Sequence, residues 1–299
     1  MRWLSDANLC HLREAADQPD LAGTPYEIVE TLGRGGMGTV YLARDHDLDR
    51  EVALKVVGGG SDLAERTLRE ARILARLEHP GIVPVHDVGT LPDGRVFYVM
   101  KRVRGRRLDE LAPTLDLAER LRVFGRICEA VSFAHAHGVI HRDLKPENIM
   151  AGPFGEVLVM DWGVAKDGGL PDAEGTILGT PGYMAPEQAR GEVDSIDGRT
   201  DVWALGAILG FLLAGEERVA RPLAAIRGQA MADDPADRYQ KVEDLAADLS
   251  CYSSGLAVRA YRENLIERTV RFVRRYRVPI LLVLTYLLMR ALLLVIFHR

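Results

Sequence analysis

The chain has 299 residues, of which 47% are hydrophobic and 27% are charged, and this is the composition of an ordinary globular protein. The formal net charge is −5 and aromatic residues make up only 6%, so neither value indicates a nucleic-acid-binding protein. The three cysteines, Cys10, Cys128 and Cys251, lack metal-ligand spacing, which favours free thiols in a reducing compartment.

Residues 1–25 are expected to form a short extension, because Pro19, Gly23 and Pro25 interrupt any helix that starts within it. Its first residues lack the long apolar core of a signal peptide. Strand-like sequences follow at 26–32, 40–44, 51–57, 83–87 and 95–101, with one helix at 64–77. Helical spacing of apolar residues then recurs at 117–137, 201–213, 222–231 and 242–251. The expected fold class is therefore α+β, with a small β-rich lobe followed by a larger α-rich lobe.

A glycine-rich segment lies between the first two predicted strands, where Gly33, Gly35 and Gly38 follow the pattern G-x-G-x-x-G-x-V. Glycines allow the backbone to approach phosphates closely and to point its amides at them. A dinucleotide-binding fold requires a helix after this motif, whereas a strand follows here at 40–44. The segment therefore predicts either a phosphate-binding hairpin or a plain glycine-rich turn.

The predicted strand at 51–57 carries a lysine that alternation places on the same face as Ala53. This residue, Lys55, needs an anion as its partner if that face is the inner one. Taken alone, the pattern fits a surface lysine on an edge strand better.

Four later motifs decide between these alternatives. They are His141-Arg142-Asp143-Leu144-Lys145-Pro146-Glu147-Asn148, Asp161-Trp162-Gly163, Ala185-Pro186-Glu187 and Asp201-Val202-Trp203-Ala204-Leu205-Gly206. With the glycine-rich segment and Lys55, this ordered set resembles the protein kinase family, and in particular the bacterial receptor-type (eukaryotic-like) serine/threonine kinases. The resemblance covers about residues 26–249. It implies a two-lobed enzyme that transfers the γ-phosphate of ATP to serine and threonine hydroxyls of proteins and phosphorylates itself.

The resemblance also assigns roles around the transferred phosphate. It implies that Asp143 accepts the proton of the substrate hydroxyl and that Lys145 steadies the γ-phosphate. It implies that Asn148 and Asp161 hold two Mg²⁺ (or Mn²⁺) ions. Such a set fits a reaction that depends on positioning and on cations that neutralise charge.

The same resemblance implies that Lys55 holds the α- and β-phosphates and pairs with Glu70 on the predicted helix, with Glu65 as the alternative partner. The hinge would be residues 101–103. The residues implied to surround ATP are Leu32, Gly33, Gly35, Gly38, Val40, Ala53, Lys55, Met100, Val103 and Met150.

Regulation and a structural ion pair follow from the resemblance as well. In the family, an arginine at the place of Arg142 pairs with a phosphorylated residue of the activation loop. Thr180 matches the threonine that bonds the catalytic Asp and Lys, so Thr176 is the expected phosphosite, unless the loop is ordered without phosphate. Glu187 is expected to form a buried ion pair with Arg238.

Two features depart from the family pattern. Trp162 stands where the family has phenylalanine, which leaves the metal-binding aspartate in place and predicts altered packing. Only residues 216–233 fill a stretch that is usually longer and includes a helix that helps to dock substrates. The docking helix is therefore expected to be missing or much shortened, while the catalytic cleft, which is built elsewhere, is expected to be kept.

The C-terminal segment 278–297 is apolar except for Arg290, and twenty residues at 1.5 Å each reach about 30 Å, the hydrocarbon thickness of a bilayer. It predicts a transmembrane helix, with a buried or oligomer-forming helix as the alternative. The basic segment 251–277 precedes it, and its arginines favour a cytoplasmic kinase domain in a single-pass protein of the cell membrane. The stretch 259–277 is also suited to lie along anionic lipid.

The predicted organisation is thus an extension (1–25), a kinase domain (26–250) with lobes at 26–102 and 103–250, the juxtamembrane segment and the span. The expected partners are ATP, protein substrates and the lipid bilayer, and no nucleic acid is expected. The sequence leaves open whether the chain forms a homodimer. Two other functions are weighed against this one. A membrane-tethered pseudokinase scaffold would explain the short docking region, and a small-molecule kinase would share the fold. The intact catalytic set argues against the first, and the segments around Thr180 and Glu187 argue against the second.

Overall fold

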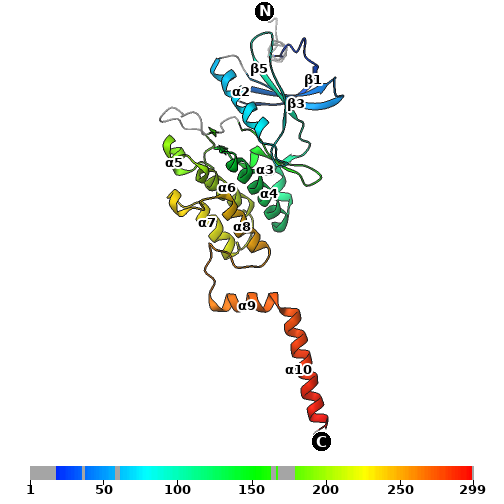
Figure 1. Cartoon of the computed structure of the whole chain (residues 1–299), viewed down its shortest axis with the longest axis vertical. Coiled ribbons are helices and arrows are strands. Elements are labelled where there is room, and N and C mark those ends of the chain that lie inside the picture. Colours follow the sequence, from blue (N-terminus) through cyan, green and yellow to red (C-terminus); the bar gives the residue numbers. More distant parts are fainter. Residues whose placement is uncertain (1–17, 36–37, 58–60, 163–165, 168–178, 298–299) are drawn as a thin grey trace, which may run out of the picture.

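The computed structural model describes residues 18–35, 38–57, 61–162, 166–167 and 179–297. A strand-rich lobe comes first and a helical lobe follows it (Figure 1). The elements of the first lobe are β1 (Tyr26–Gly35), β2 (Gly38–Asp45), β3 (Arg50–Val56), α2 (Ser61–Arg76), β4 (Val85–Thr90) and β5 (Val96–Lys101). The predicted helix at residues 8–16 lies outside the described residues.

The five strands form one antiparallel sheet in the order β1-β2-β3-β5-β4. Its central strand β3 alternates between two apolar clusters. Val52 and Leu54 belong to a cluster confined to the first lobe, whereas Ala53 belongs to the main core, which continues into the second lobe. Lys55 shares the face of Ala53, so the lysine points toward the junction of the two lobes.

The second lobe is mainly helical, and α4 is its longest helix. Its elements are β6 (Arg106–Arg107), α3 (Leu108–Leu111), η1 (Ala112–Thr114), α4 (Leu117–Ala136), β7 (Val139–Ile140), η2 (Pro146–Asn148), β8 (Ile149–Ala151), β9 (Val157–Val159), β10 (Lys166–Asp167), α5 (Pro186–Ala189), η3 (Val193–Ser195), α6 (Gly198–Leu212), α7 (Arg221–Ala230), η4 (Pro235–Asp237) and α8 (Val242–Ser253). The helix α4 begins at a capping box, in which Asp116 and Glu119 each accept the other's backbone N–H. Its face with Phe124, Ile127 and Val131 is fully buried against the neighbouring helices.

The α+β class and the two lobes are confirmed, and most predicted elements lie within a few residues of their expected bounds. The fourth strand lies at Val85–Thr90 instead of 83–87. Pro84 has no N–H to donate, although its carbonyl accepts from Lys101, so the regular ladder begins after it. Residues 213–220 join α6 to α7 without a helix between them.

After the second lobe come α9 (Leu265–Arg275) and α10 (Arg277–Phe297), which extend away from the rest of the molecule (Figure 1). Large apolar side chains of α10 are exposed, among them Leu282 and Leu288. Within the part of the chain that the structure describes, no helix reaches the length and apolarity needed to cross a bilayer.

Candidate active site

A buried ion pair joins the sheet to the helix of the first lobe. Nζ of Lys55 lies 3.2 Å from both carboxylate oxygens of Glu70, and 3.3 Å from Oδ1 of Asp161 in the second lobe. Lys55 and Glu70 are 7% and 4% exposed. Glu65, the alternative partner, is exposed on α2. The structure therefore brings together one residue from β3, one from α2 and one from the segment after β9.

The charges in this cluster hold one another in their ionised forms. Burial alone would lower the pKa of Lys55, but the carboxylates of Glu70 and Asp161 raise it above its usual value. Burial alone would likewise raise the pKa of Asp161, but the Lys55 ammonium keeps it below its usual value. The raised pKa keeps the Lys55 ammonium charged, and an ammonium can bind a phosphate group through charge-assisted hydrogen bonds.

Sequence reasoning missed Tyr98, which completes this cluster. Its hydroxyl donates a 2.8 Å hydrogen bond to Oε1 of Glu70, and its ring lies 5.6 Å from Nζ of Lys55. Burial, with the nearby carboxylate of Glu70, raises the pKa of Tyr98 well above its usual value, so the hydroxyl stays a donor. The contact depends on the register that pairs Tyr98 on β5 with Lys55 on β3, which the sequence alone does not display.

A second cluster surrounds Asp143. Nζ of Lys145 lies 2.9 Å from Oδ2 of Asp143, and the hydroxyl of Thr180 donates to Oδ1 at 2.8 Å. Nζ of Lys145 also lies 2.7 Å from Oγ1 of Thr180. Asn148 donates its side-chain amide to the backbone oxygen of Asp143 at 2.9 Å and to Oδ2 of its carboxylate at 3.3 Å. The carboxylate is thus fixed from three directions, and its side chain is still 14% exposed.

A buried carboxylate that sequence reasoning left without a role holds the backbone of this loop. Asp201, at the start of α6, accepts the backbone N–H groups of His141 and Arg142 at 2.8 Å each, and His135 lies 2.8 Å from it. Arg142 has a φ of 68°, a strained value for a residue with a side chain. The fully buried acid stabilises that conformation directly before Asp143. Its position in the Asp201–Gly206 motif was the available signal.

Two oxygen donors fit a magnesium ion. The amide nitrogen of Asn148 is used as a donor to Asp143, which leaves its amide oxygen for a metal. The Asp161 side chain is 44% exposed, and the backbone of this residue has a φ of 57°. Among the described residues, no three His, Cys, Asp or Glu side chains gather into a metal site. A carboxylate and an amide oxygen are ligands of the kind that Mg²⁺ takes from a protein, with phosphate and water completing its shell.

The residues predicted to surround the adenine lie where the lobes meet. Ala53 and Met100 are register partners on β3 and β5, and both are buried in the main core. Val40 and Val103 are partly buried and pack against the same core, and Met150 is half-buried on β8. Leu32, by contrast, is 48% exposed on β1.

The glycine-rich segment is described at Gly33, Gly35 and Gly38, the last of which pairs with Gly35 at the end of the β1–β2 hairpin. Gly38 has a φ of 138°, and a Cβ there would lie 2.3 Å from the carbonyl oxygen of Val56. No other residue fits this close approach without moving the backbone.

The tryptophan that replaces the family phenylalanine is buried and bonded. Nε1 of Trp162 donates to the carbonyl oxygen of Val159 at 3.2 Å, and its ring contacts that of His141 with centroids 4.5 Å apart. A phenylalanine could make the ring contact but not the hydrogen bond. The tryptophan therefore adds a hydrogen bond between the residue that follows Asp161 and the strand β9.

The ion pair between Glu187 and Arg238 is bidentate and fully buried, with both N–O distances at 2.8 Å. Thr200 donates to the same carboxylate at 3.0 Å, and the arginine also donates to backbone oxygens of Ala232 and Asp233. Burial alone would raise the pKa of Glu187, but these donors lower it. The pair joins α5 to the residue that directly follows η4. The expected phosphosite Thr176 lies outside the described residues.

Comparisons with known proteins agree with this geometry. A family model described as protein kinase domain matches residues 26–252. The serine/threonine-protein kinase PknD of Protochlamydia amoebophila is 34% identical over 77% of this chain and 30% of its own length. The proteins of that name from Chlamydia abortus and Chlamydia trachomatis serovar D are 35% and 36% identical, over 77% of this chain and 31% and 32% of theirs. The chain thus spans about a third of the length of these relatives.

Proposed function

This chain belongs to the protein kinase family, and we propose that it transfers the γ-phosphate of ATP to serine and threonine hydroxyls of proteins, itself included. One observation carries the proposal above the others. The carboxylate of Asp143 is held by Thr180, Lys145 and Asn148 in an arrangement that leaves it partly exposed to a substrate.

Each side chain of the site has a separate role in the proposed reaction. A substrate hydroxyl that docks beside Asp143 gives its proton to that carboxylate as the oxygen attacks the γ-phosphorus. Lys145 bonds Asp143 and would balance charge on the transferred group, since its ammonium lies 2.9 Å from the base. Lys55, oriented by Glu70, would hold the remaining phosphates. Asn148 and Asp161 would hold Mg²⁺, which neutralises phosphate charge when bound.

The two alternative functions predict different outcomes. A pseudokinase scaffold would bind Mg-ATP without turnover, and the direct connection of α6 to α7 is the feature that favours it. A small-molecule kinase would release ADP only with a metabolite present. One observation argues against both alternatives. Thr180 is bonded directly to Asp143, the proposed base, and to Lys145, and in the family its segment faces protein substrates.

The test uses the full chain in detergent or nanodiscs with Mg-ATP, a basic and an acidic model protein as acceptors, and phosphoamino-acid analysis of the products. We expect phosphoserine or phosphothreonine on an acceptor or on the chain. Phosphotyrosine alone, or ADP release without any phosphoprotein, would contradict the proposal.

We further propose that phosphorylation of Thr176 activates the enzyme. The support is the family resemblance and the presence of Arg142 directly before the base. Mass spectrometry of the chain after incubation with Mg-ATP is expected to find phosphate on Thr176, and Thr176→Ala is expected to lower activity toward an acceptor protein. Full activity in that variant would contradict the regulatory role.

We also propose that the chain is attached to the cell membrane through residues 278–297, with the kinase domain on the cytoplasmic side. The support is the sequence of this segment together with the exposed apolar side chains of α10, such as Leu281, Leu284 and Leu288. The arginines before α10 favour the cytoplasmic side for the kinase domain.

Extraction of membranes with alkaline carbonate tests the attachment. The full chain is expected to stay in the membrane pellet, whereas the double variant Leu284→Arg/Leu288→Arg is expected to appear in the supernatant. Release of the unmodified chain would contradict the attachment without touching the proposed activity.

A further inference from the structure

The short helix α9 has two opposite faces, and its apolar face is exposed. At 100° per residue its large apolar residues fall within about 160°, and Arg268, Arg271 and Arg275 fall within about 60° on the other side. The apolar residues with their exposed fractions are Leu265 (81%), Ile266 (75%), Val270 (60%), Phe272 (59%), Val273 (48%) and Tyr276 (41%). So much exposed apolar surface on one helix marks an interaction site.

Contacts at the start of α9 fix which face turns toward the protein. A capping box between Asn264 and Glu267 begins the helix. The Glu267 carboxylate then accepts the hydroxyl of Tyr261 at 2.9 Å and lies 3.3 Å from the guanidinium of Arg221 on α7. Because Glu267 belongs to the polar face, that face turns toward the second lobe at this end.

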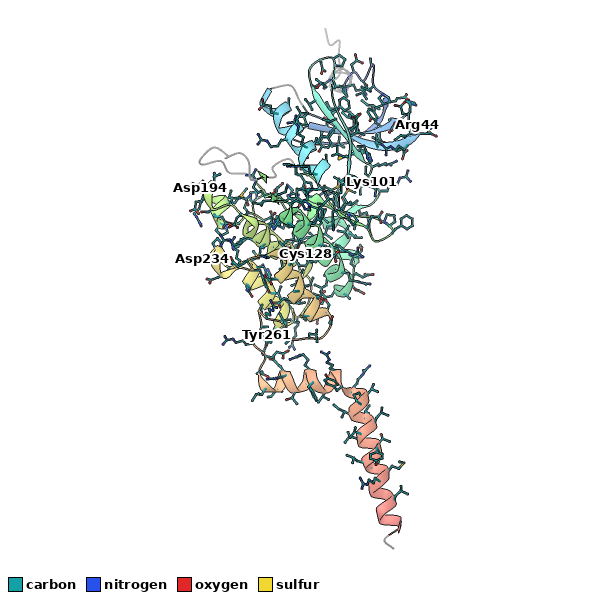
Figure 2. The ribbon with its side chains drawn as sticks, in the orientation of Figure 1. Arg44, Lys101, Cys128, Asp194, Asp234 and Tyr261 are labelled. Atoms are coloured by element: carbon teal, nitrogen blue, oxygen red, sulfur yellow. The ribbon has the colours of Figure 1, made fainter. Side chains whose placement is uncertain are left out.

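Figure 2 labels Tyr261 at the base of the second lobe, directly above α9. In Figure 1, α9 lies across the direction of α10, which continues from its last turn. This is the arrangement of a helix that lies in a membrane surface beside one that enters the membrane.

A hollow of about 250 Å³ lies along the border of the two faces, lined by Arg268, Arg271, Phe272, Arg275 and Tyr276. The Phe272 and Tyr276 rings contact each other with centroids 4.7 Å apart, and the Arg275 guanidinium lies 5.8 Å from the Tyr276 ring. Arg271 is paired with Glu263 at 2.6 Å. Arg268 and Arg275 have no carboxylate partner among the described side chains, so their donors are available to an anion.

We propose that α9 binds the surface of a bilayer that contains anionic phospholipid. Its apolar face enters the boundary between headgroups and acyl chains, and Arg268 and Arg275 bind headgroup phosphates beside the two aromatic rings. The inference rests on the membrane attachment proposed for α10, and it deepens that attachment by naming the lipid class and the residues that select it. The positive charge beside the apolar face favours lipid over a second copy of the chain, which would bring like charges together.

The experiment is hydrogen–deuterium exchange on the full chain in nanodiscs of phosphatidylcholine alone and of phosphatidylcholine mixed with phosphatidylglycerol. Amides of residues 265–275 are expected to exchange roughly thirtyfold more slowly in the anionic discs, the effect expected of two arginines at a charged surface. Arg268→Gln/Arg275→Gln is expected to abolish the difference. The matched control Arg259→Gln/Arg262→Gln removes the same charge outside α9 and is expected to preserve it.

Each other outcome overturns a distinct claim. Equal exchange in both lipids, with the chain captured by the discs, would refute the binding of anionic headgroups and leave the attachment through α10 intact. Failure of the discs to capture the chain would refute the attachment itself. Protection that rises with protein concentration in lipid-free detergent would identify a second copy as the occupant of the apolar face and contradict the inference.

Discussion

The hydroxyl of Thr180 donates a 2.8 Å hydrogen bond to Oδ1 of Asp143, although the two residues lie 37 positions apart in the chain. This bond joins the segment before α5 to the loop that carries the proposed base. Lys145 contacts both partners, so the three side chains form a closed triangle. The position of the carboxylate therefore depends on how the Thr180 segment is folded, which gives the enzyme a physical basis for regulation through that segment.

Thr180→Ala is expected to lower kcat about tenfold to a hundredfold, because one of the groups that fix the carboxylate is removed and small misplacements are costly in catalysis. Thr180→Ser keeps the hydroxyl and is expected to restore most of the rate. Steady-state kinetics with an acceptor protein would measure both. Equal losses in the two variants would show that the methyl group, and not the hydroxyl, matters.

Glu70→Gln is expected to lower kcat/KM for ATP about tenfold or more, since Lys55 loses the carboxylate that orients it and raises its pKa. Glu65→Gln is the matched control, because the same substitution is then made at an exposed position of the same helix. Its kinetics should equal those of the parent. A large loss in the Glu65 variant with little loss in the Glu70 variant would reverse the assignment.

Glu187→Gln is expected to destabilise the protein by about 3–5 kcal/mol at pH 7, because it leaves Arg238 buried and charged without its partner. The folded-state pKa of Glu187 lies below its usual value of 4.5, so the ionised pair contributes fully above about pH 4.5. That contribution disappears as the pH falls through the lower folded pKa. Urea unfolding at several pH values should show parent and variant converging in acid, and a gap that stays constant down to pH 3 would contradict the argument.

Trp162→Phe restores the family residue and removes the hydrogen bond from Nε1 to the Val159 carbonyl. We expect a loss of about 1–3 kcal/mol in the free energy of unfolding, from the bond and the smaller ring, with phosphoryl transfer largely preserved. Calorimetry would measure the loss of stability, and an activity assay on the same preparation would measure phosphoryl transfer. Inactivity with unchanged stability would mean that the tryptophan has a catalytic role that its contacts do not explain.

Much of the fold was predictable because local patterns and long-range packing agree in this chain. Alternation placed Lys55 on the same face of its strand as Ala53. The resemblance to the kinase family then implied that this face is the inner one and selected Glu70 over the exposed Glu65. The motif around Asp143 placed Lys145 and Asn148 on one short loop, where the structure has them bonded to that residue. Patterns of this kind depend on neighbours in sequence, which a sequence displays directly.

The features that were missed depend on contacts between distant segments. Tyr98 reaches Glu70 only because β5 pairs with β3 in one register, and Asp201 reaches the backbone of Arg142 across 59 residues. The bounds of the fourth strand were wrong because Pro84, which cannot donate to a ladder, precedes it. The sequence of α9 predicts its two faces, but the exposure of the apolar face is visible only in the structure.

The most direct test of the central claim is transfer of labelled phosphate from ATP to protein by the full chain and by Asp143→Asn, with Mg-ATP binding measured for both. Asp237→Asn, an exposed position in the same lobe, is the matched control. We expect the parent and the control to incorporate label, and Asp143→Asn to bind Mg-ATP as well as the parent while incorporating label at least about a hundredfold more slowly. Tight Mg-ATP binding without label in the parent, or equal rates in the parent and Asp143→Asn, would contradict the assignment of Asp143 as the base of a working kinase.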